Sequence, residues 1–287
     1  MENKETVLVT GGSGFIGSHC IIQLAAAGYN VKATVRDLSR TNKLNQILLN
    51  GLEKHEGKSD LSVDWQVANL SSDEGWEEAV KGCDYVLHVA SPIGMELPKN
   101  EDEMVKPAVE GTLRVLKAAS KEGIKRVVIT SSVAAIMYGT DKQGVFDEED
   151  WTNPESKTTN VYAKSKTLAE KAAWDFIEKD TSGMELSTVL PAMVFGPILE
   201  EDFGVSVGAI LDMMNGKYPI VPNWDMGVVD VRDVASLELL AMTKPEAAGK
   251  RFVCSAENMF MKDQNEYLSE IFPESASKIP KRVAPNW

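Results

Sequence analysis

Two residues with complementary acid–base chemistry, Tyr162 and Lys166, stand four positions apart in a predicted helix, 160–179. Residues i and i+4 share one face of a helix, one turn apart. An ammonium beside a phenol favours the phenolate, so we expect Lys166 to lower the pKa of Tyr162 from about 10 toward neutral. Such a phenol can donate a proton to a carbonyl oxygen or accept one from an alcohol. The alternative is an exposed helix with a core tyrosine, because this spacing alone is a weak signal.

A pair of hydroxyl side chains, Ser131 and Ser132, directly follows the predicted strand 126–130. A serine at that strand end can hold a substrate oxygen within reach of Tyr162. The Tyr–Lys pair, the serines and a glycine-rich stretch near the N-terminus form a stronger signal together than any one of them alone. They predict an acid–base centre that acts on a carbonyl or an alcohol.

The glycine-rich stretch covers residues 7–17, with the sequence VLVTGGSGFIG. It predicts a short apolar strand, a turn with glycine at positions 11, 14 and 17, and a helix over 18–27. Gly12, with glycines 14 and 17, also fits the dinucleotide fingerprint. Glycines let backbone N–H groups approach a pyrophosphate, which then sits at the positive end of the helix dipole. A glycine-rich surface loop is the alternative, but the flanking strand and helix favour a dinucleotide-binding site.

The end of the second predicted strand, 30–36, distinguishes the two nicotinamide cofactors. An acidic residue there binds the ribose 2′-hydroxyl, whereas an arginine accommodates a 2′-phosphate. The strand ends in Val35, Arg36 and Asp37, and Lys43 adds a second positive charge in the next segment. We predict NADPH, with Arg36 as the main phosphate contact. In the alternative, Arg36 is a solvated charge and Asp37 holds the ribose of NADH.

Predicted strands and helices alternate over the first two thirds of the chain. This rhythm predicts an α/β fold, a doubly wound and mostly parallel Rossmann sheet with helices on both faces. After the strand that begins at Val7, we predict strands at 30–36, 61–68, 85–89, 126–130 and 186–190, and helices at 41–49, 73–80, 103–121 and 160–179.

Prolines and glycines break this rhythm from Pro191 onward. We therefore predict a dinucleotide-binding Rossmann domain over 1–190, which carries the Tyr–Lys helix, and a small C-terminal substrate-binding lobe over 191–287. The lobe would cap the carboxyl edge of the sheet without an independent core. Its predicted helices are 206–215, 232–242 and 263–271, and its predicted short strands are 227–231 and 252–254.

Composition excludes several other classes of protein. The chain has 287 residues, 43% of them hydrophobic and 25% charged, which is typical of a globular protein. A formal net charge of −13 disfavours nucleic acid and anionic membranes as partners. No apolar run spans a bilayer and no signal core precedes the first strand, so we expect a soluble, cytoplasmic monomer or homodimer. The three cysteines and three histidines match no metal-binding spacing; we predict buried cysteines, a core His88 and no metal site.

These motifs resemble the extended short-chain dehydrogenase/reductase superfamily, and more narrowly its dihydroflavonol-4-reductase-like group. The resemblance runs over nearly the whole chain. It is carried by residues 7–17, 34–37 (TVRD), 88–92 (HVASP), 105–112 (VKPAVEGT), 126–135, 162–166 and 229–235 (VDVRDVA). It implies an NADPH-dependent reductase that transfers a hydride to the carbonyl of a ketone or aldehyde and so produces an alcohol.

The resemblance also implies roles for individual residues. Tyr162 would protonate the developing alkoxide, Lys166 would bind the nicotinamide ribose, and Ser132 rather than Ser131 would hold the carbonyl. The implied NADP(H)-binding residues are Thr10, Gly11, Gly14, Phe15, Ile16, Gly17, Arg36, Lys43, Asn69, Leu70, Val89, Ala90, Ser91, Thr130, Tyr162, Lys166, Pro191 and Val194. The substrate, a small hydrophobic or aromatic carbonyl compound, would contact Ser91, Ile93, Ser132, Val133, Met193, Phe203 and Val205.

Two departures from the group accompany two alternative functions. Pro107 and Ala108 occupy the place where nucleotide-sugar epimerases and dehydratases carry asparagine, which disfavours that branch. The second alternative is a regulator that binds NADPH without turnover; such proteins commonly lose the tyrosine or the lysine, and both are present here. Relatives usually continue for several tens of residues beyond the position of Trp287, so a C-terminally shortened cap is expected.

Overall fold

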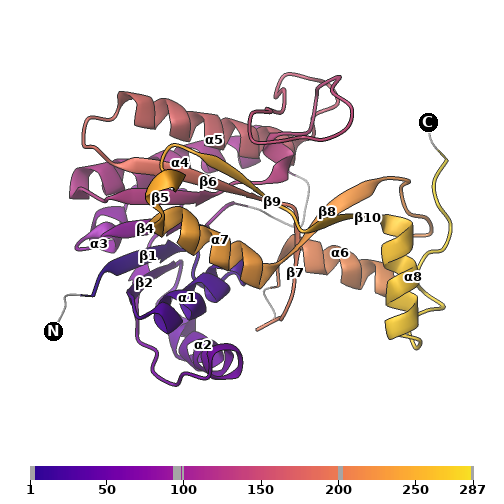
Figure 1. The fold of residues 1–287 in the computed structure, drawn as a ribbon, viewed down its shortest axis with the longest axis horizontal. Helices are drawn as coiled ribbons and strands as arrows, with labels where there is room; N and C mark the ends of the chain where they lie inside the picture. The colour runs from indigo at the N-terminus through magenta and orange to yellow at the C-terminus, as the bar shows by residue number, and fades with distance from the viewer. Residues whose placement is uncertain (1–3, 93–97, 99, 200–202, 286–287) are drawn as a thin grey trace.

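The fold is built on one parallel sheet of seven strands (Figure 1). The structure is a computed structural model that describes residues 4–92, 98, 100–199 and 203–285. The strand order is β3-β2-β1-β4-β5-β6-β9, and every neighbouring pair is parallel. The strands are β1 (Thr6–Thr10), β2 (Asn30–Val35), β3 (Val63–Val67), β4 (Tyr85–His88), β5 (Arg126–Thr130), β6 (Glu185–Pro191) and β9 (Arg251–Cys254). The predicted doubly wound Rossmann fold is confirmed.

Helices cover both faces of this sheet, as Figure 1 shows. On one face lie α1 (Phe15–Ala27), α2 (Thr41–Glu56) and α7 (Val231–Thr243); on the other lie α3 (Trp76–Val80), α4 (Asp102–Glu122) and α5 (Val161–Lys179). The strand side chains alternate between two apolar cores, because successive residues of a strand point to opposite faces. Val7 and Val9 join the core beneath α1 and α7, whereas Leu8 joins the core beneath α4.

Helix α2 is seven residues longer than the predicted 41–49. Leu44, Leu48 and Leu52 are all buried, and their spacing of four continues one apolar face through the helix. Gly51 interrupts helix propensity, yet its missing side chain is needed, because a Cβ there would lie 2.6 Å from the Ile22 Cδ1 atom. The helix ends at Gly57, whose φ of 62° closes it.

Helix α3 begins at Trp76 instead of the predicted residue 73. Gly75 precedes it with a φ of 88°, a left-handed conformation that a helix interior does not accept. Short 3₁₀ segments that the periodicity did not predict are η1 (Leu38–Arg40), η2 (Val133–Ala135) and η3 (Pro245–Ala247). The remaining boundaries differ from the predictions by a few residues.

The C-terminal part forms a second, three-stranded sheet beside the carboxyl edge of the first (Figure 1). It contains β7 (Met193–Phe195), β8 (Asp225–Asp230) and β10 (Glu257–Phe260), with α6 (Gly204–Met214) and α8 (Met261–Ile271) beside them. Val194 and Val229 of this sheet belong to the same core as β1 and α1. The chain then returns to the first sheet, since α7 covers it and β9 pairs with β6. The two-unit division at residue 191 stays a prediction.

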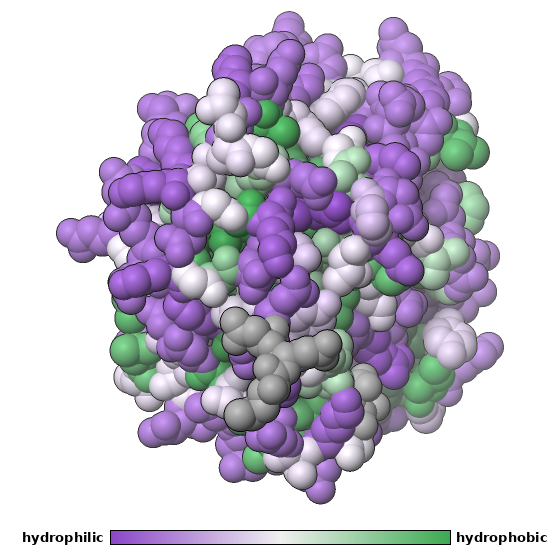
Figure 2. All heavy atoms as spheres, turned by 60° about the vertical axis from the view of Figure 1, so that its left-hand side comes forward, coloured by the Kyte–Doolittle hydropathy of each residue, from purple (hydrophilic) through white to green (hydrophobic). Residues whose placement is uncertain are grey.

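Polar and charged side chains dominate the face of the molecule in Figure 2, where apolar residues form only small separate patches. This distribution agrees with the large negative charge of the sequence. None of the helices formed by the described residues has the length and apolar character that a bilayer span requires.

Candidate active site

The predicted site residues gather at the carboxyl edge of the sheet because four neighbouring strands end there in register. Thr10 of β1 pairs with His88 of β4, and Thr130 of β5 pairs with Val189 of β6. The Thr10 hydroxyl is 2.8 Å from His88 Nδ1 and accepts a hydrogen bond from the Ala90 amide at 3.0 Å. His88 is a buried core histidine, as predicted; burial, aided by the nearby Lys166 charge, lowers its pKa to about 3.

The glycine turn between β1 and α1 has the shape that a bound dinucleotide needs. Gly11 has a φ of 68°, and a Cβ there would lie 3.0 Å from the Ala90 Cα atom. A Cβ on Gly17 would overlap the carbonyl oxygen of Gly11. Gly14 is the N-cap of α1, and no side chain caps this helix, so its positive end faces the turn uncovered. These residues fit a pyrophosphate held by backbone N–H groups.

The loop after β2 presents Arg36 and Lys43 to solvent, and both are exposed. Asp37 is the N-cap of η1: it accepts hydrogen bonds from the Ser39 amide at 2.9 Å and the Ser39 hydroxyl at 2.5 Å. These two bonds lower the pKa of the Asp37 carboxyl. Asp37 is thus engaged in its own turn, whereas Arg36 forms no ion pair with another described residue.

Asn69 and Leu70 lie in the turn after β3, beside α4. The Asn69 side-chain oxygen accepts a hydrogen bond from the Ser71 amide at 3.0 Å, and its backbone oxygen accepts one from the Trp76 indole at 3.2 Å. Leu70 packs so tightly on α4 that a Cβ on Gly111 would lie 2.8 Å from the Leu70 Cβ atom. The turn is therefore held rigidly at the edge of the predicted cofactor site.

Tyr162 and Ser132 lie together at the centre of the site. Asn160 is the N-cap of α5, and its side-chain oxygen accepts a hydrogen bond from the Ala163 amide at 2.8 Å, which fixes the helix start next to Tyr162. Burial raises the pKa of the Tyr162 phenol, and a hydrogen bond with the Ser132 side chain opposes that shift. The expected lowering of the Tyr162 pKa by Lys166 is wrong for this structure, because desolvation of the phenol dominates.

Lys166 is only 7% exposed and points toward the end of β5. Its ammonium donates a hydrogen bond to the Thr130 backbone oxygen at 3.3 Å. Burial lowers the pKa of Lys166 to about 8, and the carboxylates of Glu170 and Glu238 oppose this shift. A cavity of about 20 Å³ lies beside the ammonium, lined by His88, Ser91, Thr130 and other residues, with room for about one water molecule.

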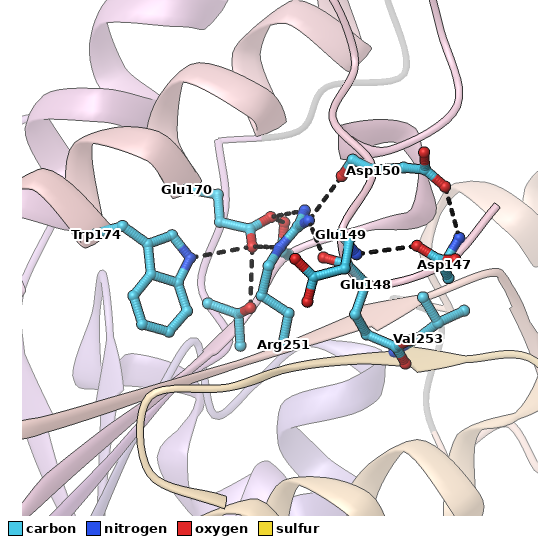
Figure 3. Close-up of polar contacts among 10 residues, drawn as sticks. Asp147, Glu148, Glu149, Asp150, Glu170, Trp174, Arg251 and Val253 are labelled. Carbon is cyan, nitrogen blue, oxygen red and sulfur yellow. Dashed lines mark hydrogen bonds and ion pairs between the residues drawn. The ribbon is translucent and has the colours of Figure 1, made fainter. Parts of the chain in front are cut away.

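Ser131, the neighbour of Ser132, has a structural partner instead of a free hydroxyl. It donates a hydrogen bond to Glu170 Oε2 at 2.5 Å. Glu170 also accepts hydrogen bonds from Thr188 at 2.9 Å and from Arg251 Nε at 2.7 Å, as Figure 3 shows. Of the two serines, only Ser132 is directed to Tyr162, in line with the expectation.

The residues expected to contact substrate lie around this centre with different exposure. Ser91, Met193 and Phe203 are half-buried, and Val205 is exposed at the start of α6. Gly204, beside Phe203, lies close to Phe15 of the glycine turn, so the lobe reaches the predicted cofactor site. Val133 packs on the core of Ala135, Ile136 and Leu190, and Val194 is a core residue. Ile93 lies outside the described residues.

Comparison with known proteins agrees with this geometry. Residues 7–255 match the model of the NAD dependent epimerase/dehydratase family. This chain belongs to that family, the extended short-chain dehydrogenases/reductases. It is 34% identical over 283 residues to dihydroflavonol 4-reductase of Arabidopsis thaliana, covering 96% of this chain and 71% of that protein. It is 35% identical over 285 residues to cinnamoyl-CoA reductase CAD2 of Medicago truncatula, covering 97% and 83%.

A solved structure of the same superfamily shows a similar fold. The yeast methylglyoxal/isovaleraldehyde reductase Gre2, complexed with NADPH, superposes with a TM-score of 0.80 at 30% identity, covering 96% of this chain and 85% of that one. Within the extended short-chain dehydrogenases/reductases, this chain is therefore similar to reductases both in sequence and in structure.

Three buried charged residues of this family member were missed by sequence reasoning: Glu170, Glu238 and Arg251. Glu170 continues the spacing of four from Tyr162 through Lys166, so the helical period contained the signal. Glu238 occupies a position on the apolar face of α7, whose buried residues are Val231, Val234, Ala235, Glu238, Ala241 and Met242. An acid inside an apolar stripe is an available signal. Arg251 has no comparable local signal, because its partners come from distant segments.

Proposed function

We propose that this protein is an NADPH-dependent reductase that converts the carbonyl of a ketone or aldehyde into an alcohol. The observation that carries the proposal is the meeting of the Tyr162 phenol and the Ser132 hydroxyl at the sheet edge where the glycine turn opens α1. The similarity to plant and yeast reductases supports the same reaction class. When bound, NADPH supplies the hydride that the carbonyl carbon receives.

The chain's own residues supply the proton and the alignment. Ser132 donates a hydrogen bond to the carbonyl oxygen and holds it beside Tyr162. Tyr162 then gives its proton to that oxygen as negative charge develops on it. Because burial raises the pKa of Tyr162, the phenol stays protonated at neutral pH, which is the form that a proton donor needs. Lys166 contributes its positive charge and holds the nicotinamide ribose.

The choice of NADPH is supported by the loop after β2. Arg36 and Lys43 are exposed and able to meet a 2′-phosphate, whereas the Asp37 carboxylate already accepts two hydrogen bonds from Ser39. An acid engaged in its own turn is poorly placed to bind a ribose 2′-hydroxyl. The uncapped positive end of α1 would hold the pyrophosphate of the same cofactor.

The test is the oxidation of NADPH, followed by its absorbance, with a panel of aliphatic and aromatic ketones and aldehydes. We expect Tyr162→Phe to lower kcat by about 10²-fold or more while NADPH affinity, measured by fluorescence, changes little. The matched control is Tyr85→Phe, which removes a phenol at the opposite end of the sheet, where it lies 3.4 Å from Glu5.

Tyr85→Phe should retain the parental rate. Turnover by Tyr162→Phe close to the parental rate would rule out the proposed proton donor. Tight NADPH binding with no oxidation by any carbonyl compound in the panel would contradict the reductase assignment itself.

A further inference from the structure

One buried carboxylate near the site has no role in the proposed reaction. Glu238 of α7 is 0% exposed. Its Oε1 atom accepts a hydrogen bond from the Thr130 hydroxyl at 2.6 Å. Its Oε2 atom is buried and has no hydrogen-bond partner among the described residues. A buried carboxylate with one unsatisfied oxygen is costly, so its presence calls for a compensating interaction.

Thr130 links this carboxylate to the catalytic lysine. Its side chain donates to Glu238, while its backbone oxygen accepts from the Lys166 ammonium at 3.3 Å. The same residue at the end of β5 therefore contacts an anion from α7 and a cation from α5. The two charges approach the strand end from helices on opposite faces of the sheet, and each favours the charged form of the other.

The second carboxylate near Lys166 is already neutralised. Glu170 forms a buried ion pair with Arg251 at 2.7 Å and accepts hydrogen bonds from Ser131 and Thr188 (Figure 3). Glu238 has no such cationic partner, and the other ionisable groups that sense its charge are the buried thiols Cys20 and Cys254. Glu238 is thus the acid whose charge is available to balance Lys166.

We propose that Glu238 is a positioning residue of the active site, which acts through Thr130 to keep Lys166 charged and in place at the end of β5. The inference rests on the proposed function for the role of Lys166, but the contacts that carry it do not depend on any substrate. Burial raises the pKa of Glu238 to about 7, so it titrates in the range where Lys166, with a pKa of about 8, also changes charge. The buried pair shares one region of charge that responds near neutral pH.

The decisive variant is Glu238→Gln, which keeps the shape and an oxygen that accepts from Thr130 but removes the charge. The pH dependence of kcat/KM for reduction should lose its basic side at lower pH, shifted by about one unit, because Lys166 loses the anion that favours its ammonium. The pH dependence of NADPH binding, read by fluorescence, should shift in the same direction without any turnover.

The matched control is Glu185→Gln. Glu185 also contacts β5, but at its far end, where it binds Arg126 at 2.6 Å. Loss of that carboxylate should leave both pH profiles in place even if it lowers stability. A purely structural role for Glu238 predicts the same unmoved profiles for Glu238→Gln, and this result would overturn the proposal.

Infrared difference spectroscopy provides a readout that needs neither cofactor nor substrate. In the parental protein, the band of a protonated, buried carboxylic acid should disappear as the pH is raised through about 7, and Glu238→Gln should lack it. Should Glu238→Gln fold poorly, Thr130→Val tests the same link, since loss of the hydroxyl donor should move the band's titration to higher pH. No titrating band in the parental protein would refute the inference even if carbonyl reduction is found.

Discussion

The buried ion pair between Arg251 and Glu170 allows a quantitative test of the site's support (Figure 3). The side chains are 9% and 1% exposed, and Arg251 also donates hydrogen bonds to the backbone oxygens of Glu148 and Asp150 at 2.6 and 2.7 Å. Its guanidinium stacks 3.7 Å from the centre of the Trp151 ring. Arg251→Met removes all of these contacts and leaves the Glu170 charge buried. We expect it to lower the free energy of unfolding by about 3–5 kcal/mol.

Urea unfolding, followed by tryptophan fluorescence and far-UV circular dichroism, measures this loss as a lower midpoint at an unchanged slope. The double variant Arg251→Met/Glu170→Gln should recover about 1–3 kcal/mol, because the unpaired charge is then gone. The exposed pair Lys121–Glu77, 69% and 74% exposed, is the matched control, and Lys121→Met should cost about 0–1 kcal/mol. An equal cost for the Arg251 and Lys121 variants, or no recovery in the double variant, would refute the reasoning.

Two further predictions concern the cofactor. Arg36→Gln should weaken NADPH binding by about tenfold or more while NADH binding is spared, measured by fluorescence titration, because a hydrogen bond to a charged group contributes about 1.5–3 kcal/mol; equal losses for both cofactors would remove the assignment, and Arg282→Gln, an exposed arginine of the C-terminal segment, is the control. Gly17→Ala should weaken the binding of either cofactor by about tenfold or more, since the added Cβ overlaps the Gly11 carbonyl oxygen and displaces the turn; unchanged affinity would mean that the turn does not hold the pyrophosphate.

The fold was predictable from the sequence because its elements carry local signals. The alternation of apolar strands with amphipathic helices, and the glycines at 11, 14 and 17, are each encoded in short segments. The boundaries that were wrong depended on contacts between distant residues. Helix α2 continues past Gly51 because Ile22 fills the space left by the missing side chain, and no pattern within the helix contains that information.

The candidate site was predictable in composition but not in electrostatics. Tyr162, Lys166 and Ser132 followed from their types and spacing. The pKa of Tyr162 did not, because the i,i+4 rule counts only the neighbouring charge and not the desolvation that the fold imposes on the phenol. Glu238 lies far from these residues in sequence and meets them only through α7, which packs against the strand that ends at Thr130.

The return of the chain to the first sheet makes the lobe an insertion instead of an appendage. Strands β7 and β8 lie in the sequence between β6 and β9, which are themselves paired neighbours in the main sheet. A fragment that stops at residue 190 would lose an edge strand and the α7 cover of one core face, so it is a poor candidate for independent folding. Conversely, the segment between Ala192 and Asp230 is tethered at both ends to the same rigid frame. Grafting that segment from a relative is thus a way to exchange the pocket wall while leaving the acid–base residues untouched.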